Sequence, residues 1–257
     1  MKKEFNSKNR FNLTGVSVFY TPTNKIIEQI YNHKKMSGTL FIVSLNPEII
    51  VALNNDLSKK NAFENADYQI IDGVGIYLAG KLKGMQIDRC SGVDFLYHCL
   101  EVANQKKQKV LFIGGKGDLS KQVVKKVSSL YPSLQALGIE GFSNISKFSS
   151  EEENNIWETV SSFGPDIVFV SFGSTFQEEW IYKNLDKFGG AVVSGVGGAF
   201  SIIAGEVRRA PKILRFMGLE WLWRLFQEPY RWRRQLKLFT FMKLVAIDVF
   251  GRQKRIE

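Results

Sequence analysis

The alternation of short apolar runs with amphipathic stretches is the feature that most constrains the fold of this 257-residue chain. Four runs rich in β-branched or aromatic residues, each ending at Gly, Asn or Ser, are expected to form buried strands. They cover residues 39–45, 109–113, 166–172 and 191–196. Continuous apolar strands that alternate with helices predict an α/β fold, with a mostly parallel Rossmann-like sheet and helices on both faces.

Four helices are expected around these strands, at residues 47–54, 91–104, 119–131 and 150–162. Asn46 has the side chain of a good N-cap, and Pro132 would end the third helix. The fourth begins with Ser150 and three glutamates, which suit the positive end of a helix dipole.

Short turns mark the carboxyl ends of the strands, at residues 44–47, 72–75, 114–117, 173–175 and 197–198. Ligands of open parallel sheets bind beyond these ends. Glycine recurs in the turns and lets a backbone approach a ligand closely. We therefore expect one shared ligand crevice.

The basic residues are concentrated in the last fifth of the chain. Residues 206–257 carry 13 Lys/Arg against 5 Asp/Glu, whereas residues 1–205 carry 22 against 20. We expect an α/β catalytic domain over 1–205 and a basic, aromatic, membrane-associating helical appendage over 206–257, broken at Pro229. This excess of positive charge predicts an anionic ligand or surface as partner.

Neither a membrane-spanning helix nor a metal site is expected. No stretch reaches the ~20 apolar residues of a spanning helix, and residues 1–12 lack the apolar core of a signal peptide. The two cysteines, Cys90 and Cys99, and the two histidines are too few for a zinc site or a disulfide framework. A reducing, cytosolic setting is therefore expected.

Two turns are candidates for chemistry. Asp72, beside glycines at a strand end, can act as a general base toward an attacking hydroxyl; an aspartate that caps a turn is the alternative. The backbone N–H groups around Gly114 and Gly115 can hold a phosphate or a sugar. That turn matches neither G-x-G-x-x-G nor a P-loop, and a tight turn without a ligand is the alternative.

Side chains at two helix positions are weaker candidates. Gln177 and Glu178 open the helix after Gly173 and can hydrogen-bond a sugar or a base. A solvated first turn rich in helix-favouring acids is the alternative interpretation.

The appendage supplies arginines and an apolar helix. Arg224, Arg231 and Arg234 fall on one broad side of a helical segment, and their guanidinium groups suit a diphosphate. The alternatives are a solvated face or attraction to anionic lipid heads. Residues 236–250 resemble an interfacial membrane helix, with a core-packing or dimer-forming helix as the alternative. Its polar residues share one arc of the helical wheel: Lys237, Thr240, Lys243 and Asp248.

Five short motifs lie in order along residues 16–236. The first three are Asn46-Pro47-Glu48, Asp72-Gly73-Val74-Gly75 and residues 89–94, and the last two lie within 195–211 and 220–234. Together they resemble the WecG/TagA/CpsF glycosyltransferase family, with its Thr-x-Asn-Pro-Glu, Asp-Gly-x-Gly and Arg-x-x-Gly-x-Asp patterns. The order and spacing of the motifs over one chain carry the resemblance.

The resemblance implies an inverting transfer from a UDP-sugar without a metal or other cofactor. The sugar would be N-acetylmannosamine, its uronic acid or a related hexose. The acceptor would be a polyprenyl-diphosphate-linked sugar, and the product would enter teichoic acid, enterobacterial antigen or capsule synthesis. We therefore expect a peripheral protein on the inner face of the cytoplasmic membrane. The oligomeric state stays open.

The resemblance also implies roles for individual residues. Asp72 would be the base, while Asn46 and Arg89 would line the sugar and acceptor pocket. Gln177 would contact substrate, and the three arginines would close over the UDP phosphates. The remaining UDP-sugar contacts are expected from Ser44, Gly114, Gly115, Glu178, Gly197, Gly198 and Ser201.

The sequence departs from the family pattern at four positions. Ser44 replaces Thr, Thr175 and Phe176 replace Pro and Lys, and Ser201 replaces Asp. A catalytically inactive family member that scaffolds a polysaccharide-synthesis complex is therefore the alternative function. A Rossmann oxidoreductase or epimerase would require G-x-G-x-x-G and a later acid, which the chain lacks. A balanced α/β body is a poor fit for a nucleic-acid-binding protein, which would bind with steep salt dependence.

Overall fold

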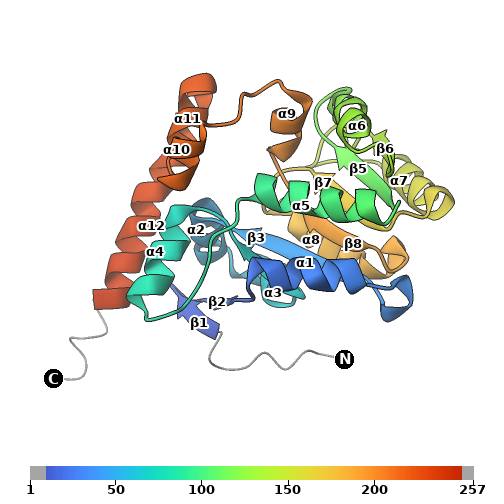
Figure 1. Ribbon diagram of the computed structural model, residues 1–257. Helices are drawn as coiled ribbons and strands as arrows, with labels where there is room; N and C mark the ends of the chain where they lie inside the picture. The colour runs from blue at the N-terminus through green and yellow to red at the C-terminus, as the bar shows by residue number, and fades with distance from the viewer. Residues whose placement is uncertain (1–9, 251–257) are drawn as a thin grey trace. The chain divides into compact units, whose positions relative to one another are not determined.

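The computed structural model describes residues 10–250 and contains a six-stranded sheet (Figure 1). Its strands are β3 (Leu40–Leu45), β4 (Tyr68–Ile71), β5 (Lys109–Gly114), β6 (Gln135–Ile139), β7 (Ile167–Ser171) and β8 (Val192–Gly195). Their order is β4-β3-β8-β7-β5-β6, and the neighbours from β3 to β6 pair in parallel. The predicted mostly parallel α/β sheet is confirmed.

The four expected strands are present, and the sequence patterns explain them. Val43, Val168 and Val193 on three neighbouring strands are fully buried, because helices cover both faces of a parallel sheet. Strand β6 lies at the edge and is only half-buried. Its weak pattern, Gln-Ala-Leu-Gly-Ile, is the reason that sequence reasoning missed it.

The expected helices also form, and the predicted N-cap at Asn46 is confirmed. Helix α2 (Pro47–Asn55) begins after Asn46, whose side-chain oxygen accepts a 3.0 Å hydrogen bond from the amide of Ile49. Helix α7 (Ser150–Phe163) begins with a capping box between Ser149 and Glu152. Helices α5 (Gly92–Gln105) and α6 (Leu119–Leu130) follow the expected ranges within two residues.

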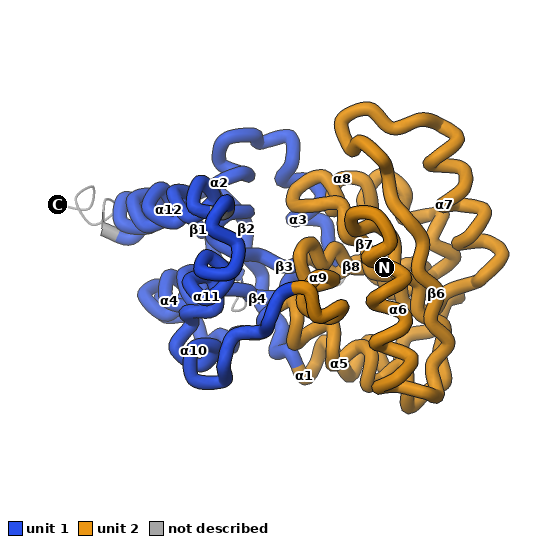
Figure 2. The backbone as a smooth tube through the Cα atoms, turned by 90° about the horizontal axis from the view of Figure 1, so that it is seen from above, with its two compact units in different colours: residues 1–23, 44–91, 207–257 blue, residues 24–43, 92–206 orange. Residues whose placement is uncertain are grey.

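Contacts group the described residues into two compact units (Figure 2). Within residues 10–250, unit 1 draws on residues 10–23, 44–91 and 207–250, and unit 2 on residues 24–43 and 92–206. In unit 2, α7 and α8 (Phe176–Lys183) lie on one face of the strands, and α5 and α6 lie on the other (Figure 2). These units do not follow the expected boundary at residue 205, and the functional division there stays a prediction.

Unit 1 contains an antiparallel hairpin, β1 (Arg10–Leu13) and β2 (Val16–Phe19), which sequence reasoning also missed. Leu13 pairs with Val16, so the loop consists of Thr14 and Gly15 alone, both with positive φ. A two-residue loop of this kind suits the twist of a hairpin. Helix α3 (Lys60–Glu64) also belongs to unit 1 and precedes β4.

The end of the chain forms three helices of unit 1, α10 (Lys212–Phe216), α11 (Glu220–Gln227) and α12 (Trp232–Phe250). A short 3-10 turn at Pro229–Arg231 separates the last two, which confirms the predicted break. No helix within residues 10–250 is long and apolar enough to cross a membrane.

Helix α12 packs against α2 and α4 (Val74–Leu82) of the same unit. Phe241 and Val245 on its inner side are buried. Near the end of α12, Asp248 forms a 2.8 Å ion pair with Lys83 and accepts a 2.8 Å hydrogen bond from the amide of Thr14. The helix is therefore anchored at its inner face.

Candidate active site

Backbone hydrogen bonds bring three of the sequence motifs together at the ends of β3 and β4. The amide of Asp72 donates to the carbonyl oxygen of Leu45 at 2.8 Å, and the amide of Cys90 donates to that of Ile71 at 3.1 Å. The three predicted catalytic residues therefore stand on adjacent segments of unit 1.

The turn after Asp72 packs directly on the Asn46-Pro47 turn. Gly73 has a φ of 89°, and a Cβ there would lie 3.1 Å from Cδ of Pro47 and 3.9 Å from Cβ of Asn46. A larger residue at 73 would be strained and would push the two turns apart. Glycine here keeps Asp72 and Asn46 close. Ser44, one residue before the end of β3, is half-buried in the same unit.

Arg89 supports the last turn of α10. Its Nη2 donates a 2.5 Å hydrogen bond to the carbonyl oxygen of Arg215. The next turn contains Gly218, where a Cβ would lie 2.6 Å from Cβ of Val74 and 2.9 Å from Nη1 of Arg89. A substrate contact by Arg89 stays a prediction, because this contact is to protein backbone.

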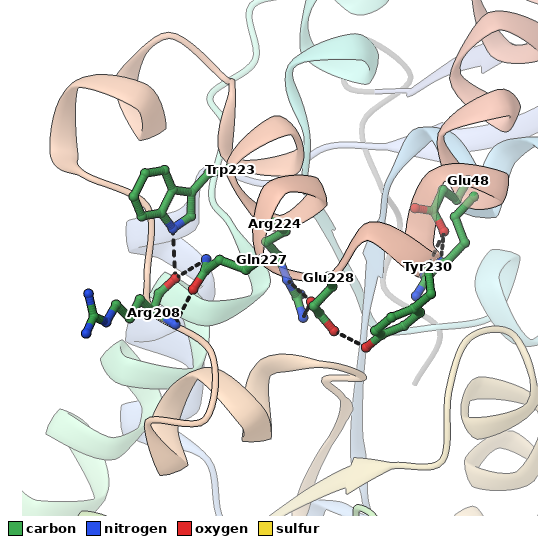
Figure 3. A network of polar contacts seen from close by, with 8 residues as sticks. Glu48, Arg208, Trp223, Arg224, Gln227, Glu228 and Tyr230 are labelled. Carbon is green, nitrogen blue, oxygen red and sulfur yellow. Dashed lines mark hydrogen bonds and ion pairs between the residues drawn. The ribbon is translucent and has the colours of Figure 1, made fainter.

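Polar contacts fix α11 to the segment before α10 (Figure 3). Gln227 exchanges two 2.9 Å hydrogen bonds with the backbone of Arg208, to its N–H and its carbonyl oxygen. Trp223 Nε1 donates to the same carbonyl oxygen at 2.9 Å. These contacts set the position of the helix that carries Arg224.

Two of the three predicted arginines form ion pairs in this region of unit 1. Arg224 lies 3.0 Å from Glu228, and Arg234 lies 2.6 Å from Glu48 (Figure 3). The side chain of Arg231 lies outside what the structure describes. Sequence reasoning missed both carboxylate partners, although Glu48 belongs to the Asn-Pro-Glu motif and Glu228 precedes Pro229.

Unit 2 contains a cavity of about 270 Å³ at the carboxyl ends of β5 and β6, lined by residues 115–117 and 140–143. Gly114, Gly115 and Gly117 all have positive φ. A Cβ on Gly114 would lie 2.7 Å from the carbonyl oxygen of Ser171, so only glycine fits. The amide of Gly115 donates to that oxygen at 3.0 Å, so a ligand would have to bind the other groups of the turn.

The second wall of the cavity, residues 140–143, was not identified from the sequence. A Cβ on Gly141 would collide with the ring of Phe172 and lie 2.9 Å from Cα of Gly114. Phe142 packs against Phe172, Phe176 and other rings, so the unusual Phe176 belongs to an aromatic cluster beside the cavity.

Glu152 holds the end of this wall. One carboxylate oxygen accepts a 2.8 Å hydrogen bond from the amide of Ser143, and the other accepts one from the amide of Ser149. These backbone donors lower the pKa of Glu152 to about 2. The wall is therefore held by an ionised carboxylate at neutral pH.

Gln177 and Glu178 are buried in unit 2, with exposed fractions of 2% and 1%. The amide of Gly173 donates to Oε1 of Gln177 at 3.1 Å, and Nε2 of Gln177 donates to Oε1 of Glu178 at 2.7 Å. Burial is the largest cause that raises the pKa of Glu178 to about 7. In this arrangement both side chains support the turn after β7, and their contact with a substrate stays a prediction.

The turn after β8 lies beside the turn after β7. The hydroxyl of Ser171 donates to the carbonyl oxygen of Gly197 at 2.7 Å. Gly198 precedes α9 (Ala199–Ala204), in which Ser201 is half-buried. The structure thus groups Gly197 with the β7 turn of unit 2, and a ligand role for Gly197, Gly198 and Ser201 stays a prediction.

Among the described residues, no three His, Cys, Asp or Glu side chains gather as a metal-binding group. In unit 1, Asn46 and Asp72 lie at the carboxyl ends of strands, and in unit 2 the glycine turns after β5 and β8 do so as well. Ligands of α/β proteins bind at this edge of the sheet, beyond the carboxyl ends of the strands.

The sequence matches one family model and several known proteins. The profile described as glycosyl transferase WecG/TagA/CpsF family matches residues 11–255. An N-acetylglucosaminyldiphosphoundecaprenol N-acetyl-beta-D-mannosaminyltransferase of Bacillus subtilis (strain 168) is 31% identical over 214 residues, covering 82% of this chain and 80% of the relative. A protein of the same name from Staphylococcus aureus (strain MW2) is 28% identical over 240 residues, covering 92% of each. The chain therefore belongs to the WecG/TagA/CpsF family of glycosyl transferases.

Proposed function

We propose that this chain transfers an N-acetylmannosamine-like hexose from a UDP-sugar to a polyprenyl-diphosphate-linked acceptor. The product would enter a cell-surface polysaccharide or teichoic acid. The names of the relatives support the sugar and the acceptor class. The observation that carries the proposal is the position of Asp72, at the end of β4 and packed beside Asn46.

The proposed reaction is a single displacement. Asp72 takes the proton of an acceptor hydroxyl, whose oxygen attacks the anomeric carbon and inverts it. The bond to UDP breaks, and the leaving diphosphate receives positive charge from Arg224, Arg231 and Arg234. Backbone N–H groups of the glycine turns supply further donors. The proposed reaction uses no metal and no organic cofactor.

The glycine-lined cavity of unit 2 is proposed as a ligand site. The arginines of unit 1 are proposed to bind phosphates. Glycines at 114 and 141 leave bare backbone near that cavity, which suits a phosphate or a sugar. Guanidinium groups match the geometry of phosphate oxygens.

Membrane association is proposed through the outer face of α10–α12. These helices expose large apolar side chains next to a concentration of Lys and Arg. That combination is typical of helices that lie in the membrane interface. The exposed apolar residues are Ile213, Phe216, Met217, Phe226, Tyr230, Trp232, Leu236, Phe239, Met242 and Ile247.

The test is UDP release from a panel of UDP-sugars, with a short polyprenyl-diphosphate-linked N-acetylglucosamine as the acceptor. Acceptor-dependent release supports the proposal and identifies the donor. Absence of release together with absence of UDP binding in calorimetry would overturn it and favour the scaffold. Binding of UDP without turnover would contradict only the proposed identity of the acceptor.

A further inference from the structure

Three arginines are proposed to bind the diphosphate, and the structure describes the side chains of Arg224 and Arg234. A carboxylate holds each of these two in the same manner (Figure 3). Oε2 of Glu228 accepts from Nε of Arg224 at 3.2 Å and from its Nη2 at 3.0 Å. Oε2 of Glu48 lies 2.8 Å from Nε of Arg234 and 2.6 Å from its Nη2. Two arginines on different helices thus present the same edge to a glutamate, which points to a shared role for the two glutamates.

We propose that Glu228 and Glu48 are positioning residues, which hold Arg224 and Arg234 in the conformation that receives the diphosphate of the donor. This inference rests on the proposed function. An arginine side chain has many rotamers and loses that freedom when it binds a ligand. A carboxylate that fixes the guanidinium beforehand removes part of this loss from the binding step.

One guanidinium group can bind a glutamate carboxylate and a phosphate at the same time. The group carries five N–H donors in a planar fork. In both pairs, the carboxylate oxygen uses the edge formed by Nε and Nη2. A phosphate can be held in a bidentate manner through the edge formed by Nη1 and Nη2.

Glu228 is itself fixed by its neighbours. Its side chain is 13% exposed, and its Oε1 accepts a hydrogen bond from the hydroxyl of Tyr230. Its amide donates to the carbonyl oxygen of Arg224 at 2.8 Å. A glutamate that served only to balance exposed surface charge would not need such support.

Glu48 is fixed in a different way. It lies in the first turn of α2, which Asn46 caps, and negative charge is favourable at a helix N-terminus. Its partner Arg234 comes from the first half of α12, so the pair also links two segments far apart in sequence. A half-exposed ion pair contributes little to folding stability on average, which leaves orientation as the larger expected effect.

A competing role makes the opposite prediction. If the carboxylates only paired with the arginines until a diphosphate displaced them, neutralising a carboxylate would tighten UDP binding. If the carboxylates position the arginines, the same substitution should weaken UDP binding. Full-length Glu228→Gln and Glu48→Gln, compared with wild type by calorimetry with UDP, decide between the two.

We expect each substitution to weaken UDP binding roughly tenfold. The melting temperature should change little in Glu48→Gln, because its ion pair is half-exposed. Glu28→Gln is the matched control, because it neutralises a glutamate in the exposed 2.8 Å pair with Lys25 on α1 (Thr23–Asn32). Its UDP affinity should stay within about twofold of wild type, because an exposed ion pair outside the proposed binding residues contributes little. Glu228→Asp, which keeps the charge, is the second variant if Glu228→Gln folds poorly.

Double variants show which arginine each carboxylate acts through. Glu228→Gln should have no further effect on UDP affinity in an Arg224→Ala chain, and its full effect in an Arg234→Ala chain. Equal effects in both backgrounds, or tighter binding in either single variant, would overturn the positioning role. A wild-type chain that binds no UDP would overturn the proposed function itself, which is a separate result.

Discussion

The amide of Asp72 donates a 2.8 Å hydrogen bond to the carbonyl oxygen of Leu45, the residue before Asn46. The backbone of the proposed base is thereby fixed beside the N-cap of α2. Because the position depends on backbone contacts and on Gly73, a substitution that changes only the carboxylate should leave the turn intact.

Asp72→Asn is therefore expected to remove proton transfer while UDP binding persists. Loss of a general base lowers the rate by ~10²–10⁴-fold, so acceptor-dependent UDP release should fall by that order. Asp186→Asn, at an exposed position of unit 2, is the control and should retain activity. Activity close to wild type in Asp72→Asn would remove Asp72 as the base.

Gly141→Ala should close part of the cavity and destabilise unit 2. Its Cβ would meet the ring of Phe172 and Cα of Gly114, and overpacking of this kind costs roughly 1–3 kcal/mol. Urea denaturation should show lower stability, and calorimetry should show weaker UDP binding. Ser143→Ala, in the same wall, adds no bulk and should leave the free energy of unfolding close to wild type. UDP affinity unchanged in a destabilised Gly141→Ala chain would place the nucleotide elsewhere.

The buried Glu178 should make folding stability depend on pH. Burial raises its pKa from 4.5 to about 7, so the folded chain binds this proton more tightly than the unfolded chain does. This contribution is fully present below about pH 4.5 and is lost as the pH rises to about 7, a change of roughly 3 kcal/mol. Urea denaturation of wild type and Glu178→Gln at pH 5 and pH 8 measures it.

Glu178→Gln should lack this pH-dependent contribution. Relative to wild type, the free energy of unfolding of the variant should therefore be higher at pH 8 than at pH 5. Parallel changes in the unfolding free energies of both chains would show that Glu178 titrates in its ordinary range.

Replacing exposed apolar residues of α12 should weaken membrane binding without unfolding the chain. Leu236, Phe239 and Ile247 are more than half exposed, whereas Phe241 and Val245 are buried. Deletion of the whole helix would therefore change membrane binding and folding stability together. A triple change of the exposed residues to Ser should reduce flotation with anionic liposomes by roughly tenfold or more. Met36→Ser with Leu57→Ser, two other exposed apolar positions, is the control. Undiminished flotation of the triple variant would contradict membrane binding through α12.

The sequence predicted most of the sheet, because the buried strands are continuous apolar runs and the helix caps are local signals. Strand β6 and the β1–β2 hairpin escaped prediction for different reasons. The first is a half-buried edge strand with little apolar pattern, whereas the hairpin turn at Thr14-Gly15 was a signal that could have been used.

The candidate site was predictable where its chemistry is local and not where it depends on distant partners. The positions of Asp72 and Asn46 at strand ends followed from the pattern. The pairing of Glu48 with Arg234 joins residues 186 positions apart, and burial of Glu178 depends on the packing of α8. Neither leaves a periodic signal in the sequence.

The path of the chain through the two units has a consequence for biosynthesis. Unit 2 has all of its residues once residue 206 has been made, whereas unit 1 needs residues that are made later. Until then, α2 and α4 lack Phe241 and Val245 against them. A translation product interrupted between residues 206 and 224 would therefore have the residues of the glycine-lined cavity without Arg224 and Arg234, the two arginines proposed for the diphosphate.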